Sequence, residues 1–159
     1  MIDLSIDTCT LVDASGKGLA EHQAASIGLL REFETDPELI LVVDKNGFVL
    51  HEYDDNINAS MFATAWLKQH AGRILKVDTR PIPRGLRVQL DELHFSVRDR
   101  RFVQVALASA SRLIVTREPD FSPPVCQVLR REAHILVLGP AEALSYIRAI
   151  RERPPCADV

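Results

Sequence analysis

Short hydrophobic runs along the chain predict the strands of a parallel β-sheet. Four runs are rich in leucine or β-branched residues and do not alternate with polar residues; they cover residues 10–12, 39–43, 112–116 and 135–138. Uninterrupted apolar runs of this length are typical of strands that are covered on both faces. A weaker run at 74–77 is compatible with an edge strand.

The segments between these runs carry apolar residues at helical spacing. Phe102, Ala106 and Ala110, for example, repeat at i, i+4 and i+8 and so fall on one face of a helix. The predicted helices cover residues 19–34, 60–70, 98–110, 124–132 and 140–151. Strands that alternate with helices predict an α/β fold, a three-layer α/β/α sandwich around a mainly parallel sheet. Residues 78–87, rich in proline and arginine, are expected to form a long loop.

Length and composition predict one globular domain. The chain has 159 residues, of which 47% are hydrophobic and 26% are charged, and this balance can bury a core without disulfides. We expect one domain over residues 1–153 and a short flexible tail over 154–159. No apolar run approaches the roughly 20 residues that span a bilayer, and the N-terminus does not resemble a secretory signal, so no membrane association is expected. The three cysteines, at 9, 126 and 156, are far apart and form no C-x-x-C pair, which favours a reducing, cytoplasmic location.

The charge is divided unevenly between the two halves of the chain. Residues 1–79 contain 6 Lys and Arg against 13 Asp and Glu, whereas residues 80–159 contain 13 Arg, no Lys and 9 acids. Such an asymmetry can mark a nucleic-acid-binding face, because the planar guanidinium suits phosphate. It is equally compatible with a solvated surface or with two halves that attract each other within one fold.

Acidic residues follow three of the four strong predicted strands. Asp13 follows the run at 10–12, Asp44 follows the run at 39–43, and Glu118 and Asp120 follow the run at 112–116. In open α/β sheets, ligand sites lie beyond the carboxyl ends of the strands. We therefore expect these carboxylates to gather at one edge of the sheet.

Two further acids are expected to come from helices. Asp99 shares the inward stripe of Val103 and Ala106, although Ser96-x-x-Asp99 also resembles a capping box that would make it a helix cap. Glu52 lies four residues after Phe48 and would fall beside an apolar face if this stretch is helical.

A cluster of carboxylates indicates a hard divalent cation. Carboxylates brought together repel one another, and a bound cation relieves that repulsion. Oxygen ligands suit Mg²⁺ or Mn²⁺, and the five histidines form no pair with the spacing of zinc ligands. Cations of this kind can activate water for phosphodiester cleavage.

The order of these motifs resembles the PIN domain, a magnesium-dependent ribonuclease fold that is found in many bacterial toxins. The likeness rests on Leu-Val-Asp-Ala-Ser at 11–15, on Asp-x-x-Phe-Val-x-Val-Ala at 99–106 and on the segment from Leu113 to Phe121. The closing segment at 135–143 and the stretch from Asp44 to Tyr53 are also similar to the family pattern.

The resemblance implies a metal-dependent endoribonuclease whose Mg²⁺ or Mn²⁺ ion is held by Asp13, Glu52 and Asp99. Either Glu118 or Asp120 would be the fourth acid, because the family's Thr-x-Asp is Thr-Arg-Glu here.

The resemblance also implies roles for residues around this ion. Ser15 and Thr116 would support the site, and Arg100 and Arg101 would bind the RNA backbone. Arg117 would either contact phosphate or pair with an acid.

The partners implied by the resemblance are RNA, an antitoxin protein and a second copy of the chain. A catalytically inactive module on the same fold, which binds RNA or protein, is the main alternative. Another phosphate-handling α/β domain is the third, but the P-loop spacing is absent and no lysine follows Lys76, as a receiver-like site would need.

Overall fold

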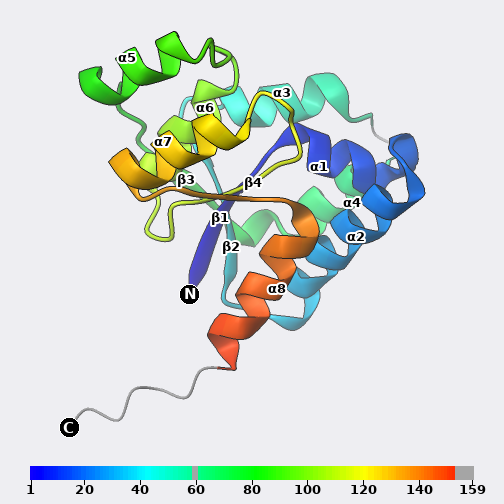
Figure 1. The fold of residues 1–159 in the computed structure, drawn as a ribbon. Coiled ribbons are helices and arrows are strands. Elements are labelled where there is room, and N and C mark those ends of the chain that lie inside the picture. The colour runs from blue at the N-terminus through cyan, green and yellow to red at the C-terminus, as the bar shows by residue number, and fades with distance from the viewer. Residues whose placement is uncertain (59–60, 153–159) are drawn as a thin grey trace, which may run out of the picture.

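The computed structural model describes residues 1–58 and 61–152, in which strands and helices alternate along the chain (Figure 1). The strands are β1 (Ile2–Ile6), β2 (Leu39–Asp44), β3 (Ile74–Val77), β4 (Leu113–Val115) and β5 (Leu136–Leu138). The helices are α1 (Thr8–Val12), α2 (Ala20–Thr35), α3 (Phe48–Asn56), α4 (Phe62–Gln69), α5 (Arg84–Glu92), α6 (Arg100–Ala108), α7 (Pro123–Ala133) and α8 (Pro140–Arg151). A π-helical turn, η1 (Asp13–Lys17), and a 3₁₀ turn, η2 (Ala71–Arg73), complete the assignment.

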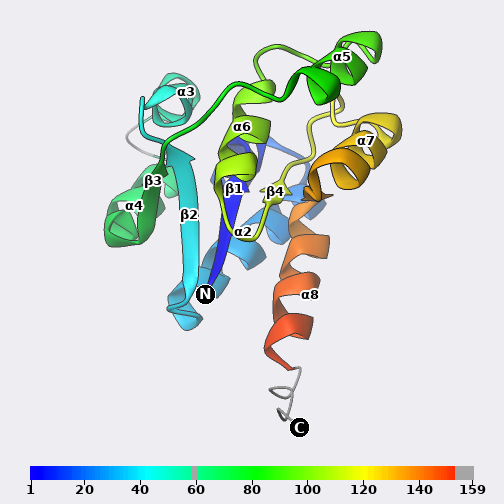
Figure 2. The ribbon, with the colours of Figure 1, turned by 90° about the vertical axis from the view of Figure 1, so that its left-hand side faces the viewer.

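The five strands form one parallel sheet in the order β3-β2-β1-β4-β5. The helices α2 and α8 pack together on one face, and α6 lies against β1, β2 and β4 on the other (Figure 2). The predicted three-layer α/β/α sandwich is confirmed. The strand order reverses at β1, so a crevice is expected between the carboxyl ends of β1 and β4.

The central strand β1 is the element that sequence analysis missed. The predicted strand at 10–12 is wrong: these residues belong to α1, and the strand is Ile2–Ile6. Asp3 and Ser5 interrupt the apolar pattern of β1, yet every residue of the strand is buried. The Asp3 carboxylate is satisfied there by the backbone N–H groups of Ala110 and Ser111, at 2.8 and 2.6 Å. A polar residue can therefore occupy a covered strand, which makes the apolar pattern incomplete.

Most of the other predicted elements agree with the structure. The runs at 39–43, 74–77, 112–116 and 135–138 all contain strands, and β3 is an edge strand as expected. The predicted loop at 78–87 is wrong from Arg84 onward, where α5 begins directly after Pro83. The tail predicted over 154–159 lies outside the described residues, and the single domain over 1–153 stays a prediction.

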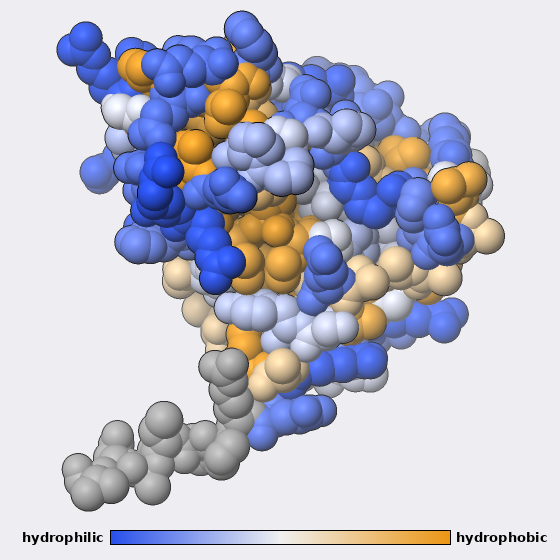
Figure 3. Space-filling view, in the orientation of Figure 1, coloured by the Kyte–Doolittle hydropathy of each residue, from blue (hydrophilic) through white to orange (hydrophobic). Residues whose placement is uncertain are grey.

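The second edge of the sheet leaves a hydrophobic hollow open. All three residues of β5 are half-buried, and hydrophobic side chains gather over this strand between α7 and α8 (Figure 3). The hollow measures about 420 Å³ and extends from Val137 and Leu138 to Phe121 and Glu118. It therefore reaches the segment after β4, where the candidate site begins.

Helix α3 is held at the carboxyl ends of β2 and β1 by polar contacts. The Asp44 carboxylate, at the end of β2, accepts the backbone N–H groups of Phe48 and Val49 at 2.9 and 2.7 Å. Further along the helix, the buried Tyr53 hydroxyl donates to the carbonyl of Ile6. These contacts place Glu52 beside the end of β1.

Removing the Asp44 carboxylate is expected to destabilise the fold. An Asp44→Ala variant leaves two N–H groups at the start of α3 without an acceptor, and losses of this kind cost about 1–2 kcal/mol. Urea unfolding measures the change. Asp54→Ala is the matched control on the same helix, because Asp54 is exposed, and surface substitutions of this kind stay within about 0.5 kcal/mol. Equal stability of the two variants would contradict this role of Asp44.

Candidate functional site

An acidic cavity of about 350 Å³ opens at the carboxyl ends of β1 and β4. Five carboxylates line it, from Asp7, Glu52, Asp99, Glu118 and Asp120. They arrive from separate segments: the end of β1, the middle of α3, the start of α6 and the loop after β4. Arg98 is the one cation among the described residues that line the cavity. The site is therefore strongly negative, at the place that the topology predicts.

Asp7 directly follows β1 and occupies the N-cap position of α1. Its carboxylate accepts a hydrogen bond from the Thr116 hydroxyl at 2.5 Å and a weaker one from the Cys9 thiol at 3.6 Å. Burial raises the pKa of Asp7, and the neighbouring charge of Glu118 raises it further. Asp7 is thus an acid that is costly to ionise unless a cation is near.

Glu52 has one satisfied and one unsatisfied carboxylate oxygen. Oε1 accepts a hydrogen bond from the Thr8 hydroxyl at 2.9 Å and lies 3.3 Å from the guanidinium of Arg98. Oε2 is buried and has no hydrogen-bond partner among residues 1–58 and 61–152. Because a buried carboxylate oxygen without a partner is unfavourable, a cation at this atom would be stabilised.

Asp99 is buried at the N-cap position of α6, where its side chain makes no capping hydrogen bond. Burial raises its pKa from 3.8 to about 7, and the charges of Asp7 and Glu118 add to the effect. Ser96, the capping partner that Ser96-x-x-Asp99 predicts, accepts a long hydrogen bond of 3.5 Å from the Asp99 N–H, and its hydroxyl partly offsets the rise in the pKa of Asp99. The Asp99 carboxylate also lines the acidic cavity with Asp7 and Glu118.

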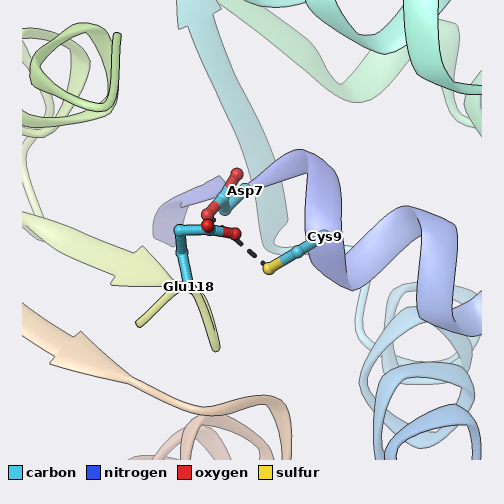
Figure 4. A group of neighbouring side chains, drawn as sticks. All are labelled: Asp7, Cys9 and Glu118. Atoms are coloured by element: carbon cyan, nitrogen blue, oxygen red, sulfur yellow. Dashed lines mark hydrogen bonds between the residues drawn. The ribbon is translucent and has the colours of Figure 1, made fainter. Parts of the chain in front are cut away.

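Thr116 connects the two strand ends that meet at the cavity. Its hydroxyl donates to Asp7 and accepts the backbone N–H of Glu118 at 2.9 Å. This contact holds the Glu118 side chain over Asp7, with Cys9 beside both (Figure 4). The supporting role expected for Thr116 is consistent with this geometry. Glu118 is half-buried and Asp120 is exposed, so Glu118 lies deeper in the cavity.

The structure places Asp13 away from the acids with which sequence analysis grouped it. Asp13 belongs to η1 and is not among the residues that line the acidic cavity. Its carboxylate forms an ion pair with Arg117, whose Nε lies 3.1 Å from Oδ2. Asp13 was interpreted as an acid at the end of a strand over 10–12, but these residues are helical. The acid that follows the strand is Asp7.

Three other predicted residues are engaged outside the cavity. Arg117 pairs with an acid, Asp13, which was one of the two roles expected for it, the other being a contact to phosphate. Ser15 accepts the N–H of Ala63 at 3.2 Å and so supports α4. Arg100 forms an ion pair with Asp91 at 2.6 Å.

Arg101 remains exposed at the surface. Its guanidinium lies 4.6 Å from the centre of the Phe48 ring.

Sequence analysis missed Asp7, Cys9 and Arg98. Ile2, Leu4 and Ile6 alternate with polar residues and end at Asp7, which is the signal that could have identified the strand and its terminal acid. Cys9 and Arg98 carry no spacing signal, because only the fold brings them to the cavity.

The donor set fits a hard divalent cation. All five acids offer carboxylate oxygens, which Mg²⁺ and Mn²⁺ prefer, and the unpartnered Glu52 Oε2 lies among them.

Comparison with protein-family models, with curated proteins and with solved structures yields no match. Among residues 1–58 and 61–152, no helix is long and apolar enough to cross a membrane. The proposal of a function therefore rests on the site itself and on the motif resemblance.

Proposed function

We propose that the chain is an endoribonuclease of the PIN-domain type that depends on Mg²⁺ or Mn²⁺. The observation that carries this proposal is the convergence of five carboxylates on one cavity, with a buried carboxylate oxygen that has no partner. A fold that needed only stability would not retain such a repulsive cluster, because each buried acid is costly without a compensating charge.

The chain's own residues would hold the cation in this way. Asp7, Glu52, Asp99 and Glu118 supply the ligand oxygens, and Asp120, exposed on the same cavity, supplies a further oxygen near its opening. The chemistry of such a cation, when bound, is Lewis-acid activation of water and stabilisation of negative charge on the phosphate.

Two hydroxyl groups would fix the orientation of these acids. Thr116 holds Asp7 and the backbone of Glu118 in one arrangement, and Thr8 fixes Oε1 of Glu52. Acids whose positions are set by hydrogen bonds need little rearrangement when a cation binds, which is the usual advantage of a preorganised site.

Two exposed arginines are suited to bind the RNA backbone. Arg98 lies at the cavity and its side chain is 61% exposed, although it is paired with Glu52. Arg101, three residues further along the chain, lies over the Phe48 ring. Two phosphate contacts to a single strand would give a slope of about −1.4 in log K against log salt. The choice of RNA as substrate rests on the motif resemblance.

The test is cleavage of structured and unstructured RNA by the pure chain, with Mg²⁺ or Mn²⁺ and then with excess chelator. We expect cleavage that chelator abolishes and that returns when the cation is restored. An Asp54→Asn chain should cleave RNA as the unaltered chain does, since Asp54 is exposed on the same helix as Glu52 but lies outside the cavity.

Two outcomes would contradict the proposal. Cleavage that persists in chelator would point to a different mechanism or to a contaminant. Salt-sensitive RNA binding without cleavage would favour the alternative of an inactive binding module.

A further inference from the structure

Asp7, Cys9 and Glu118 combine two carboxylates with a thiol in one corner of the acidic cavity. One ligand atom from each residue, a carboxylate oxygen or the Cys9 sulfur, lies within 4.8 Å of the other two (Figure 4). Asp7 is buried, whereas Cys9 and Glu118 are half-buried and so can be reached from solvent. A mixed oxygen and sulfur set differs in chemistry from the oxygen-only set of a magnesium site, because thiolate is a soft ligand.

The spacing between the Cys9 thiol and the Asp7 carboxylate suits zinc. A tetrahedral zinc ion with bonds of about 2.3 Å to sulfur and about 2.1 Å to oxygen separates these two ligand atoms by about 3.6 Å. Cys9 Sγ lies 3.6 Å from Asp7 Oδ2. Three protein ligands would leave one of the four zinc positions open, as in zinc sites that are accessible to solvent.

A second observation points to a cation in the same cavity. Glu52 is 7% exposed, lines the cavity with Asp7 and Cys9, and keeps its Oε2 atom without a hydrogen-bond partner among the described residues. Although Arg98 and Thr8 contact Oε1, the cavity that contains the thiol therefore also contains one buried carboxylate oxygen without a protein partner.

We propose that Asp7, Cys9 and Glu118 bind a thiophilic divalent cation of the Zn²⁺ class, and that this cation excludes Mg²⁺ or Mn²⁺ from the cavity. Binding replaces the thiol proton, which is released to solvent. The exclusion follows because Asp7 and Glu118 belong to both ligand sets. Its consequence for catalysis, inhibition by Zn²⁺, rests on the proposed ribonuclease function, whereas the binding site does not.

The test uses a chain in which Cys9 is the only cysteine, made by Cys126→Ser and Cys156→Ser. Co²⁺ serves as the spectroscopic probe for zinc, because a thiolate ligand gives a charge-transfer absorption that carboxylates alone do not. We expect this absorption on Co²⁺ addition and its loss when Zn²⁺ displaces Co²⁺. A chain without the absorption would overturn the inference, and this measurement needs no change at Cys9.

The matched variant adds Cys9→Ser to that chain, with circular dichroism to verify folding. Loss of the thiolate is expected to weaken Zn²⁺ binding by more than about 100-fold, since even the loss of a partner outside the ligand set costs about 10–100-fold. Glu118→Gln, which keeps the thiol, should weaken Zn²⁺ binding while the charge-transfer absorption persists. Unchanged zinc affinity in a folded Cys9→Ser chain would overturn the inference.

Exclusion of the hard cation is measured as release of bound Mn²⁺ on addition of Zn²⁺, which requires no cleavage. Mn²⁺ that stays bound beside Zn²⁺ would overturn the exclusion. Charge-transfer absorption in a chain that never cleaves RNA would remove the proposed function and leave the zinc site standing. Cation-dependent cleavage without that absorption would remove the zinc site and leave the proposed function standing.

Discussion

Replacing Asp7 by asparagine is expected to reduce cation-dependent RNA cleavage by more than about 100-fold. Removing a residue that only supports a metal ligand already costs about 10–100-fold, and removing a ligand itself should cost more. Asparagine keeps the size of the side chain and an oxygen that can accept the Thr116 hydroxyl. It removes the negative charge that a divalent cation needs at the end of β1. The fold should tolerate the change, because the pKa of Asp7 is already raised by burial and the neutral amide avoids that desolvation.

An Asp13→Asn variant tests whether Asp7 or Asp13 is the acid of the candidate site, because the sequence predicted Asp13 and the structure places Asp7 there. Asp13 is paired with Arg117 and does not line the cavity. The variant is therefore expected to melt at a lower temperature, because Arg117 loses its partner, but to keep chelator-sensitive cleavage at temperatures where it is folded. Cleavage that is lost in folded Asp13→Asn and kept in Asp7→Asn would overturn the placement of the site.

Replacing Asp99 by asparagine is expected to stabilise the chain in the absence of divalent cations. The folded-state pKa of Asp99 is raised from 3.8 to about 7, by burial first and then by Asp7 and Glu118. Between these two values the folded chain holds a proton that the unfolded chain releases, so stability falls as the pH rises through this window. Asparagine cannot ionise, and it serves equally well at an N-cap position.

The measurement is the Tm of both chains in chelator from pH 5 to pH 8. The Tm of the parent chain should fall over this range, and that of Asp99→Asn should fall less. At pH 8 the variant should melt about 2–4 °C higher, which is the shift that about 1 kcal/mol produces in a domain of this size. Saturating Mg²⁺ should reverse the order, because cation binding stabilises the folded parent chain by mass action.

A lower Tm for Asp99→Asn at pH 8 in chelator would contradict this account and identify Asp99 as a structural residue. Asp54→Asn is the control for removing one negative charge from the chain. It is exposed, so its Tm should follow that of the parent chain at every pH.

The covered strands were predictable from the sequence because their residues are uniformly apolar. The run from Leu39 to Val43 has both faces buried between helices and contains no polar residue. The central strand β1 was not predictable in this way. Its polar residues Asp3 and Ser5 are buried, and Asp3 is compensated by N–H groups more than 100 residues away in the sequence.

The candidate site was predictable in part, because several of its acids follow predicted strands or lie on predicted helices. Glu52, Asp99, Glu118 and Asp120 were identified from spacing and line the cavity. The fifth acid was misplaced by six residues, because the apolar run at 10–12 resembles a strand but forms α1, where Leu11 is fully buried. Cys9 and Arg98 depend on tertiary packing alone, and no local pattern marks them.

The acids of the cluster come from elements that are far apart in the sequence, so the cluster can form only after these elements have associated. Asp7, Thr8 and Glu52 can meet once β1, β2 and α3 have associated, but Asp99 and Glu118 join them only when α6 and β4 dock. We therefore infer that the mutual repulsion of the acids is imposed late in folding, on a segment whose strands β4 and β5 are three residues long. Without a cation, we expect this end of the sheet to open first by local unfolding, while the larger β1-β2-β3 unit with α2 stays closed.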